Sequence, residues 1–203
     1  MFPNNLQLIF ATNNQHKLKE IKLILNSEVT ILSLKDIDCS EKLPETSSSL
    51  RGNALQKANY VFEKYGVNCF ADDTGLEIDA LSGRPGVYSA RYAGLQASDS
   101  DNVAKVLNEM KGVENRTAIF KTVIALITDR EQKTFEGMIE GEITNEPKGT
   151  SGFGYDPVFI PAGSKKTFAE MSEEEKNGMS HRSLALEKLI VYLKEAYVID
   201  KSN

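Results

Sequence analysis

Residues 6–25 read LQLIFATNNQHKLKEIKLIL, and this stretch indicates the fold class. Its first part, Leu6–Thr12, is apolar, which is typical of a buried strand. Asn13 and Asn14 end the apolar run, and apolar side chains then recur at spacings of three and four residues as far as Leu25. That spacing places them on one face of a helix. The stretch therefore predicts a strand, a polar loop and a helix, which is the beginning of an α/β fold.

The rest of the chain continues this alternation. The apolar pattern predicts strands over Val29–Leu34, Val67–Ala71, Leu76–Ala80, Thr117–Thr128, Thr134–Ile143 and Val158–Ile160. It predicts helices over Leu50–Tyr65, Val103–Met110 and Leu184–Tyr197. Asp72–Gly75 and Ser82–Gly86 are rich in turn residues and are predicted as turns. Because no linker or repeat interrupts the pattern, we expect a single domain over residues 1–203, built on a mixed sheet with flanking helices.

The composition excludes several classes of protein. The 203 residues carry 24 Lys and Arg against 29 Asp and Glu, and a net charge of −5 argues against a protein that coats nucleic acid. No apolar run approaches the ~20 residues of a transmembrane helix, and no secretory signal is visible. Cys39 and Cys69 make neither a disulfide framework nor a zinc site. We therefore expect a cytoplasmic protein without nucleic-acid or membrane partners, whereas a small phosphorylated ligand remains compatible with the charge.

Two early segments carry groups suited to phosphate and metal. Thr12–Lys17 lies where the first strand passes into a helix, and a helix N-terminus with a lysine nearby attracts anions. The alternative is an ordinary helix cap provided by Asn14. Asp72–Gly75 places two carboxylates side by side, which suits Mg²⁺ with substrate phosphates, or a carboxylate that deprotonates water. The alternative for that segment is a solvated turn.

Two later segments carry groups suited to a planar ligand. Gly152–Pro157 sets two aromatic residues between glycines, and these can offer a stacking face for a base. The alternative is that the aromatic rings fill the core. Lys176–Arg182 gathers a lysine, a histidine and an arginine, which donate hydrogen bonds to phosphate or to a carbonyl. Its alternative is a charged surface cluster, and Lys57, on a predicted helix, is by itself no different from a surface lysine.

Five segments in order resemble the inosine triphosphate pyrophosphatase family. They are Ala11–Lys17, Ala71–Leu76, Gly86–Tyr92, Gly152–Phe159 and Ser180–Arg182. Their order and spacing match the family from about Leu8 to Leu193. The resemblance implies Mg²⁺-dependent hydrolysis of noncanonical purine nucleoside triphosphates (ITP, dITP and XTP) to the monophosphate and pyrophosphate, which removes them from the nucleotide pool. It also implies an elongated mixed α/β fold with two lobes around a central cleft, and a homodimer.

The resemblance assigns roles to individual residues. It implies that the triphosphate is bound by Thr12, Asn13, Asn14, Gln15, His16, Lys17 and Lys57. Glu45 and Asp73 correspond to metal ligands, and Asp73 also corresponds to the proton acceptor from water. The remaining substrate contacts are Thr74 and, around the base, Phe153, Gly154, Tyr155, Asp156, Lys176, His181 and Arg182. Donors from His181, Arg182 and the backbone of Phe153–Asp156 would face the 6-oxo group and reject the 6-amino group of adenine.

Two positions depart from the family's pattern. Many relatives have Gly where Asn13 stands, and we expect the loop to survive because Asn tolerates left-handed geometry. An acidic residue often precedes Asn53, where this chain has Gly52, so any supporting role of that acid is absent here. Gly52 is also expected to loosen the start of its helix.

The sequence leaves rival functions open. A non-catalytic protein that binds or senses purine nucleotides is the main alternative, and it has no need of Glu45, Asp72 and Asp73 together. A relative that cleaves pyrimidine or methylated nucleotides is disfavoured by the Phe153–Asp156 and Ser180–Arg182 segments. The pattern decides neither whether Asp72 contacts the metal nor how GTP is excluded.

Overall fold

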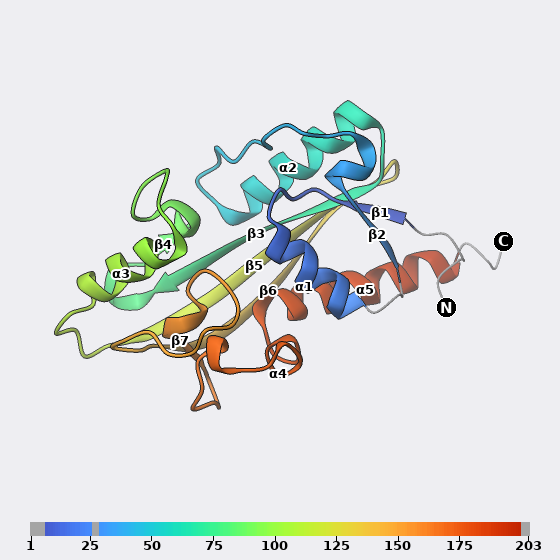
Figure 1. The fold of residues 1–203 in the computed structure, drawn as a ribbon. Helices are drawn as coiled ribbons and strands as arrows, with labels where there is room; N and C mark the ends of the chain where they lie inside the picture. The colour runs from blue at the N-terminus through green and yellow to red at the C-terminus, as the bar shows by residue number, and fades with distance from the viewer. Residues whose placement is uncertain (1–6, 26–28, 200–203) are drawn as a thin grey trace. The chain divides into compact units, whose positions relative to one another are not determined.

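The computed structural model describes residues 7–25 and 29–199, and the strands of this part form one seven-stranded mixed sheet (Figure 1). The strands are β1 (Gln7–Phe10), β2 (Thr30–Ser33), β3 (Cys69–Ile78), β4 (Arg84–Gly86), β5 (Thr117–Ile127), β6 (Gln132–Ile143) and β7 (Phe159–Pro161). Their order is β2-β1-β3-β5-β6-β7, with β4 paired to β3. β1 runs parallel to β2 and β3, whereas β4 and β7 run antiparallel to β3 and β6. The prediction of a mixed α/β sheet with flanking helices is confirmed.

The helices follow the predicted segments closely. They are α1 (Gln15–Leu25), α2 (Leu50–Tyr65), α3 (Asp99–Glu109), α4 (Glu173–Asn177) and α5 (His181–Ile199). The short 3₁₀ turns are η1 (Leu34–Ile37), η2 (Asp79–Leu81), η3 (Ser89–Arg91), η4 (Asp156–Val158) and η5 (Phe168–Glu170). α2 has the predicted bounds because Ser49 caps its start and Gly66, with a left-handed φ of 64°, ends it. Among the described helices, none has the length and apolar character needed to cross a membrane.

The chain divides into two compact units. Unit 1 comprises the described residues up to Asp73, together with Val123–Glu136 and the described part of Ser183–Asn203. Unit 2 comprises Thr74–Thr122 and Gly137–Arg182. The boundary between Asp73 and Thr74 falls inside β3, so a single strand belongs to both units. The expected single domain over residues 1–203 stays a prediction.

The core of unit 1 lies between its strands and the helices α1 and α5. Its buried members are Leu8, Phe10, Leu18, Ile21, Leu25, Val29, Phe70, Ile124, Leu126, Ala185, Leu186, Leu189 and Leu193. On the first residues of β3, Phe70 faces this core, whereas the Cys69 thiol lies 3.2 Å from the carbonyl of Ala58 in α2. Because neighbouring strand residues point to opposite faces, α2 covers the other face of these strands, as Figure 1 shows.

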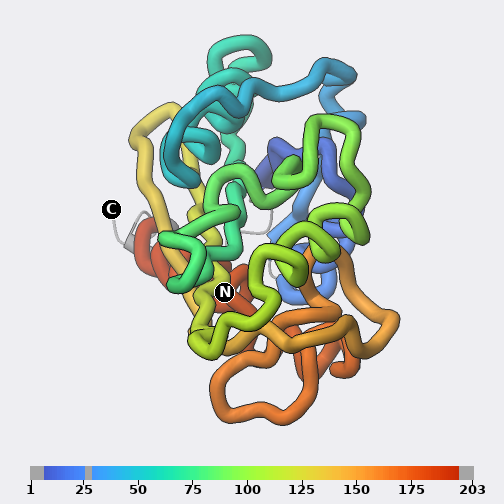
Figure 2. Tube along the Cα trace, turned by 90° about the vertical axis from the view of Figure 1, so that its left-hand side faces the viewer, coloured from blue at the N-terminus to red at the C-terminus, as the bar shows by residue number. Residues whose placement is uncertain are grey.

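The core of unit 2 is rich in aromatic residues. It contains Leu76, Ile78, Leu81, Val103, Val106, Met110, Ala118, Phe120, Ile143, Tyr155, Val158, Phe159, Phe168 and Met171. Phe120 packs edge-on against Phe159, with ring centroids 4.7 Å apart. The segment that carries η4 and η5, orange in Figure 2, folds back on itself so that these two turns contact each other. This folding brings the Phe153–Asp156 segment and α4 into one unit.

Several predicted boundaries are wrong, and the helix predicted from Val103 begins at Asp99 instead. Asp72–Gly75 is not a turn, because β3 continues through it as far as Ile78 between the neighbouring strands β1 and β5. β3 is paired with β1 at Cys69–Phe70 and with β4 at Leu76–Ile78, and the extended backbone continues between these two regions despite the turn preference of Asp, Thr and Gly. Ser82–Gly86 is a turn only in part, since Arg84–Gly86 forms β4. The last helix begins at His181 rather than Leu184, so the basic residues of Lys176–Arg182 extend into its first turn.

Candidate active site

The loop between β1 and α1 is held by its own polar side chains. Asn14 Oδ1 accepts hydrogen bonds from the backbone N–H groups of His16 (2.9 Å) and Lys17 (3.2 Å). Thr12 Oγ1 accepts from the N–H of Asn14 at 3.2 Å. Asn14 therefore caps α1, as the alternative interpretation expected. Asn13, Asn14 and the following Gln15 and His16 are exposed, which leaves their other atoms at the surface of unit 1.

Asn13 ties this loop to a second loop. Its Nδ2 donates to the carbonyl of Glu41 at 3.3 Å, and its Oδ1 accepts from the N–H of Leu43 at 3.4 Å. The left-handed backbone considered for this position does not occur, because the described non-glycine residues with positive φ are Asp38 and Ser82. Asn13 thus contributes its side-chain amide, not an unusual backbone conformation.

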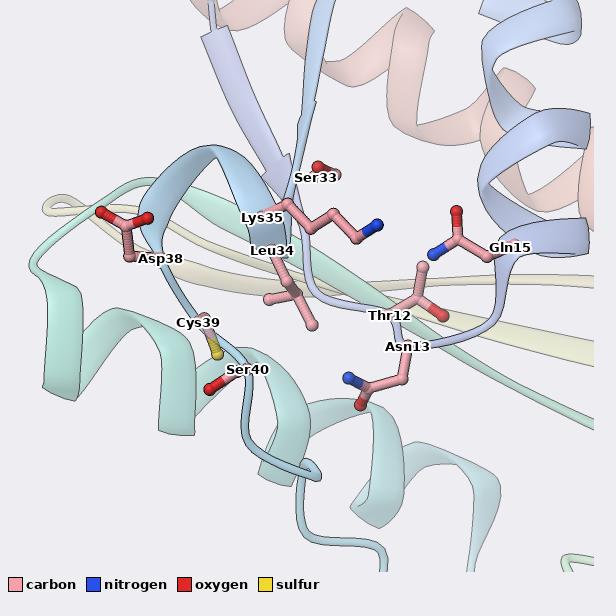
Figure 3. A pocket seen from close by; sticks show the side chains of 9 residues that line it. All are labelled: Thr12, Asn13, Gln15, Ser33, Leu34, Lys35, Asp38, Cys39 and Ser40. Atoms are coloured by element: carbon pink, nitrogen blue, oxygen red, sulfur yellow. The ribbon is translucent and has the colours of Figure 1, made fainter.

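A cavity of about 530 Å³ lies beside this loop in unit 1 (Figure 3). It is lined by Thr12, Asn13, Gln15, Ser33, Leu34, Lys35, Asp38, Cys39 and Ser40. Figure 3 shows the Lys35 ammonium and the Gln15 amide facing each other. Three of the predicted substrate-binding residues therefore line a cavity, and Lys35 adds a cation that the sequence did not single out.

Two lysines and three carboxylates meet in unit 1. Lys17 Nζ lies 3.0 Å from Asp72 Oδ1, and the Asp72 side chain is completely buried. Lys57, which is 5 % exposed, places its Nζ 2.5 Å from Glu45 Oε1 and 3.6 Å from Asp73 Oδ1. Glu45 and Asp73 therefore converge on one ammonium group. Asp72 instead engages Lys17.

The charges of this cluster are coupled through burial. Burial raises the pKa of Asp73, although Lys57 and Lys17 act to lower it. Burial acts to lower the pKa of Lys57, but the carboxylates of Asp73 and Glu45 lead the neighbouring acids in holding it above its usual value. Lys57 thus remains a cation at neutral pH, while Asp73 holds a proton more readily than an exposed aspartate does.

The donor set fits a hard divalent cation. Among the described residues, no group of three or more His, Cys, Asp or Glu side chains is arranged to hold a metal alone. Glu45 and Asp73 offer only carboxylate oxygens, and both lie near the same ammonium group of Lys57. Mg²⁺ is commonly bound by one or two carboxylates together with substrate phosphates and water. The two side chains therefore fit Mg²⁺ as it binds with a nucleotide.

A second cluster lies in unit 2 around a buried ion pair. Asp156 Oδ2 accepts from Lys176 Nζ at 2.7 Å and from the N–H of Phe153 at 2.8 Å. Both partners of the pair are almost completely buried, with 3 % of Asp156 and 6 % of Lys176 exposed. The Lys176 ammonium also lies 5.0 Å from the centroid of the Phe153 ring. The pair fixes the loop that carries Phe153.

Arg182 extends this cluster to β3. Its guanidinium lies 5.6 Å from the Phe153 ring centroid, and Nη2 donates to Thr74 Oγ1 at 3.2 Å. Thr74 Oγ1 also lies 2.7 Å from Thr122 Oγ1. The preceding His181 stacks on Phe120, with 4.6 Å between centroids and 9° between planes. Phe153 therefore has a basic side chain over its ring from each of α4 and α5.

Other groups of the predicted base-binding segment are used inside unit 2. Tyr155 is 4 % exposed, and its hydroxyl donates to the carbonyl of Ser89 at 2.8 Å. Burial raises the pKa of that hydroxyl. The N–H of Gly154 donates to Asp99 Oδ2 at 2.7 Å. Tyr155 thus fills the core, as the alternative interpretation of this segment expected, whereas Phe153 stays half-buried beside the basic groups.

Comparisons with known proteins place this geometry in a family. The profile of the Ham1 family matches residues 8–192. The chain belongs to the Ham1 family. A protein of Porphyromonas gingivalis named dITP/XTP pyrophosphatase is 55% identical over 188 residues, which cover 92% of this chain and 97% of that protein. The resemblance inferred from the five sequence segments is confirmed.

Solved Ham1 structures share the fold. The Ham1 protein of Staphylococcus aureus is 36% identical and superposes with a TM-score of 0.85 over 94% of this chain and 99% of that one. A Mycobacterium abscessus structure, described as a nucleoside-triphosphatase and dITP/XTP pyrophosphatase, is 41% identical with a TM-score of 0.74 over 91% and 98% of the two chains. The sheet and its flanking helices are therefore those of a Ham1 fold.

Sequence reasoning missed functional neighbours within this Ham1 chain. Asn53 was noticed on its helix without a role, yet its amide reaches Asp73. Its position four residues before Lys57 was a usable signal, because that spacing places both side chains on one helix face. Thr122 offered no signal, since threonine is common in strands. α2 begins at Leu50 with a regular cap, and the expected loosening at Gly52 stays a prediction.

Proposed function

We propose that this chain hydrolyses noncanonical purine nucleoside triphosphates, namely ITP, dITP and XTP, to the monophosphate and pyrophosphate. The names of its Ham1 relatives support this substrate class. The observation that carries the proposal is the convergence of Glu45 and Asp73 on the buried Lys57. Burying carboxylates such as Asp72 and Asp73 is unfavourable, and a protein that only binds an anionic nucleotide gains nothing from them. The alternative of a non-catalytic nucleotide sensor is therefore disfavoured.

The cluster of unit 1 suits the triphosphate and the attacking water. Lys17 and Lys57 bring positive charge to the phosphates, and Asp72 holds Lys17 in place. Asp73 accepts the proton of the attacking water, and the burial that raises its pKa makes it a stronger acceptor. The loop of Thr12–Lys17 contributes polar side chains beside them.

Glu45 and Asp73 would hold Mg²⁺ in this site. When bound, Mg²⁺ supplies charge neutralisation on the phosphates, including the pyrophosphate that leaves. Between substrates, the ammonium of Lys57 occupies the same surroundings and balances both carboxylates. Glu45 therefore has a partner in either state.

The cluster of unit 2 suits the purine base. Phe153 offers a ring face, and the basic side chains of Lys176 and Arg182 over it favour a 6-oxo group as acceptor. His181, which directly precedes Arg182 in the chain, adds a ring nitrogen as a further hydrogen-bonding group. A 6-amino group would set a donor against these donors, and such a mismatch lowers kcat/KM on the order of 10⁴-fold. ATP is thus expected to be a poor substrate.

The remaining expectations of the resemblance belong to the same proposal. Two buried, free cysteines, Cys39 and Cys69, suit the reducing cytoplasm in which nucleotides are made. A homodimer is proposed from the resemblance alone. The elongated outline with two lobes around a central cleft stays a prediction.

A turnover panel tests the proposal. The protein is incubated with ITP, dITP, XTP, GTP and ATP in the presence of Mg²⁺, and pyrophosphate and orthophosphate are measured separately. We expect pyrophosphate from ITP, dITP and XTP, little product from ATP, and no turnover once a chelator removes Mg²⁺. Orthophosphate as the first product, or equal rates on ATP and ITP, would overturn it. Binding of ITP without turnover would favour the sensor.

A further inference from the structure

One buried amide joins the two segments that carry the carboxylates of unit 1. Asn53, on α2, is only 1 % exposed. Its Nδ2 donates to Asp73 Oδ2 at 3.0 Å, and its Oδ1 accepts from the backbone N–H of Ser47 at 2.8 Å. Ser47 stands two residues after Glu45 in the chain. A single side chain therefore contacts the strand that bears Asp73 and the loop that bears Glu45.

The chemistry of these contacts fixes the orientation of the amide. Only the NH₂ group of Asn53 can donate to the carboxylate of Asp73, and only its oxygen can accept from the N–H of Ser47. A flipped amide would set donor against donor and acceptor against acceptor in a buried place, where unmade hydrogen bonds are expensive. Asn53 thus has one satisfied orientation, in which both links are formed.

Gly52 makes the contact with Ser47 possible. A Cβ atom at position 52 would lie 1.9 Å from Ser47 Oγ and 2.6 Å from Ser47 Cβ. The glycine therefore leaves the space that Ser47 fills against the first turn of α2. Gln56, one turn further, supports the same loop by accepting from the N–H of Thr46 at 2.9 Å. The loop that carries Glu45 is held along the face of α2 from which Asn53 reaches Asp73.

We propose that Asn53 is a positioning residue that sets Glu45 and Asp73 for joint binding of a divalent cation, and that Gly52 is needed for it. The proposal rests on the proposed function for the identity of the cation. Without the amide, Asp73 loses a donor that fixes its rotation, and the Glu45 loop loses its link to β3. Hydrogen-bond partners of metal ligands change metal affinity or activity about 10–100-fold when they are removed.

The test measures cation binding directly. Mn²⁺ replaces Mg²⁺ as the probe, since both prefer carboxylate oxygens and bound Mn²⁺ is distinguished from free Mn²⁺ by paramagnetic resonance. We expect Asn53→Ala to weaken Mn²⁺ binding about 10–100-fold and to lower kcat/KM for ITP by a similar factor. Circular dichroism on heating shows whether the variant remains folded.

Asn102→Ala is the matched control. Asn102 is 2 % exposed and also bridges two partners, since it accepts from the N–H of Ala93 (2.8 Å) and donates to the carbonyl of Ala90 (3.3 Å). It lies on α3 in unit 2. Its loss is expected to lower thermal stability as Asn53→Ala does, with Mn²⁺ affinity within about twofold of the unaltered chain. A loss of Mn²⁺ affinity as large as that of Asn53→Ala would overturn the proposal.

Gly52→Ala is expected to disturb the hydrogen bond between Asn53 and Ser47 by moving Ser47 rather than by removing Asn53. It keeps Asn53 and improves the intrinsic helix propensity of α2, but it displaces Ser47. We expect weaker Mn²⁺ binding in a folded protein, which keeps the proposal testable even if Asn53→Ala does not fold. Mn²⁺ affinity within about twofold of the unaltered chain in the folded variants would overturn the proposal.

Failure of this inference differs from failure of the proposed function. If the unaltered chain releases pyrophosphate from ITP while Asn53→Ala binds Mn²⁺ normally, the positioning role is wrong and the function stands. If the unaltered chain releases no pyrophosphate while Asn53→Ala and Gly52→Ala weaken Mn²⁺ binding, the positioning role stands and the function is wrong.

Discussion

The two polar clusters of this molecule are built on different principles. In unit 1, each lysine is set directly against a carboxylate, as Lys17 is against Asp72 and Lys57 against Glu45. In unit 2, Lys176 is also paired with a carboxylate, that of Asp156, but this lysine and Arg182 in addition both lie near the face of the Phe153 ring. Lysines and carboxylates that are paired with each other can exchange these partners for phosphates and a metal cation. An aromatic ring with cations beside it instead offers a planar face to a base. The difference suggests that one cluster serves the reaction and the other serves recognition.

The largest effect on turnover is expected in the unit 1 cluster, to which we assign the reaction. Asp73→Asn keeps the shape of the side chain but removes the proposed proton acceptor and one of the two charges proposed to bind the metal. We expect kcat for ITP to fall about 10²–10⁴-fold, the usual contribution of a positioned acid or base, while ITP still binds. Steady-state pyrophosphate release and calorimetric titration with ITP measure the two quantities.

The neighbouring carboxylate provides the control for that variant. Asp72→Asn removes the partner of Lys17 without changing Asp73. We expect KM to rise more than kcat falls, because Lys17 is proposed to hold phosphate rather than to transfer a proton. Unchanged turnover in Asp73→Asn, or an equal loss of kcat in both variants, would contradict the role given to Asp73.

A smaller effect, on the stability of the fold, is expected in the unit 2 cluster, to which we assign recognition of the base. Lys176→Met leaves the buried Asp156 carboxylate without the ammonium 2.7 Å away. Breaking such a pair from one side lowers the free energy of unfolding by about 3–5 kcal/mol. Chemical denaturation measures the change.

The double variant Lys176→Met with Asp156→Asn separates the pair from its surroundings. Removing both charges is expected to restore part of the stability, because no carboxylate is then left buried without its cation. If Lys176→Met alone is as stable as the unaltered chain, the ion pair does not hold the Phe153 loop.

The smallest effect is expected at the hydroxyl pair of unit 2. Thr122→Val removes the oxygen 2.7 Å from Thr74 Oγ1 and keeps the shape of a buried strand residue. We expect unfolding to become easier by about 1 kcal/mol, with ITP turnover changed less than about threefold because Arg182 still donates to Thr74. Thr122→Ser, which keeps the hydroxyl, should retain turnover. A loss of turnover as large as that of Asp73→Asn would contradict the different roles assigned to the two clusters.

Elements with local signals were predicted well from the sequence. α2 has its predicted bounds because a serine caps it and Gly66 ends it, and both signals lie within the helix's own neighbourhood. β5 and β6 were predicted as strands, and a tight turn closed by Thr128 N–H and the Glu131 carbonyl (2.9 Å) joins them. Asp72 and Asp73 were identified as candidate site residues because they directly follow the apolar run Val67–Ala71.

Features that depend on distant parts of the chain were not predictable in this way. Asp72–Gly75 has turn composition, but it lies within β3 between the residues that pair with β1 and those that pair with β4. The role of Asn53 depends on Ser47 and Asp73 meeting at one amide, and neither lies within a helical turn of it. Tyr155 and Phe153 have similar surroundings in sequence, yet only the structure places the first in the core.

The core of unit 1 also constrains how this protein is made. Leu8 and Phe10, near the start of the chain, pack in one cluster with Leu186 and Leu189 of α5, near its end. During synthesis, β1 must wait until α5 has left the ribosome before that cluster can close. Contacts of such sequence separation slow folding and leave apolar surface open to chaperones in the meantime. A nascent chain stalled before α5 would therefore expose the apolar face of β1 and α1 to the translation machinery.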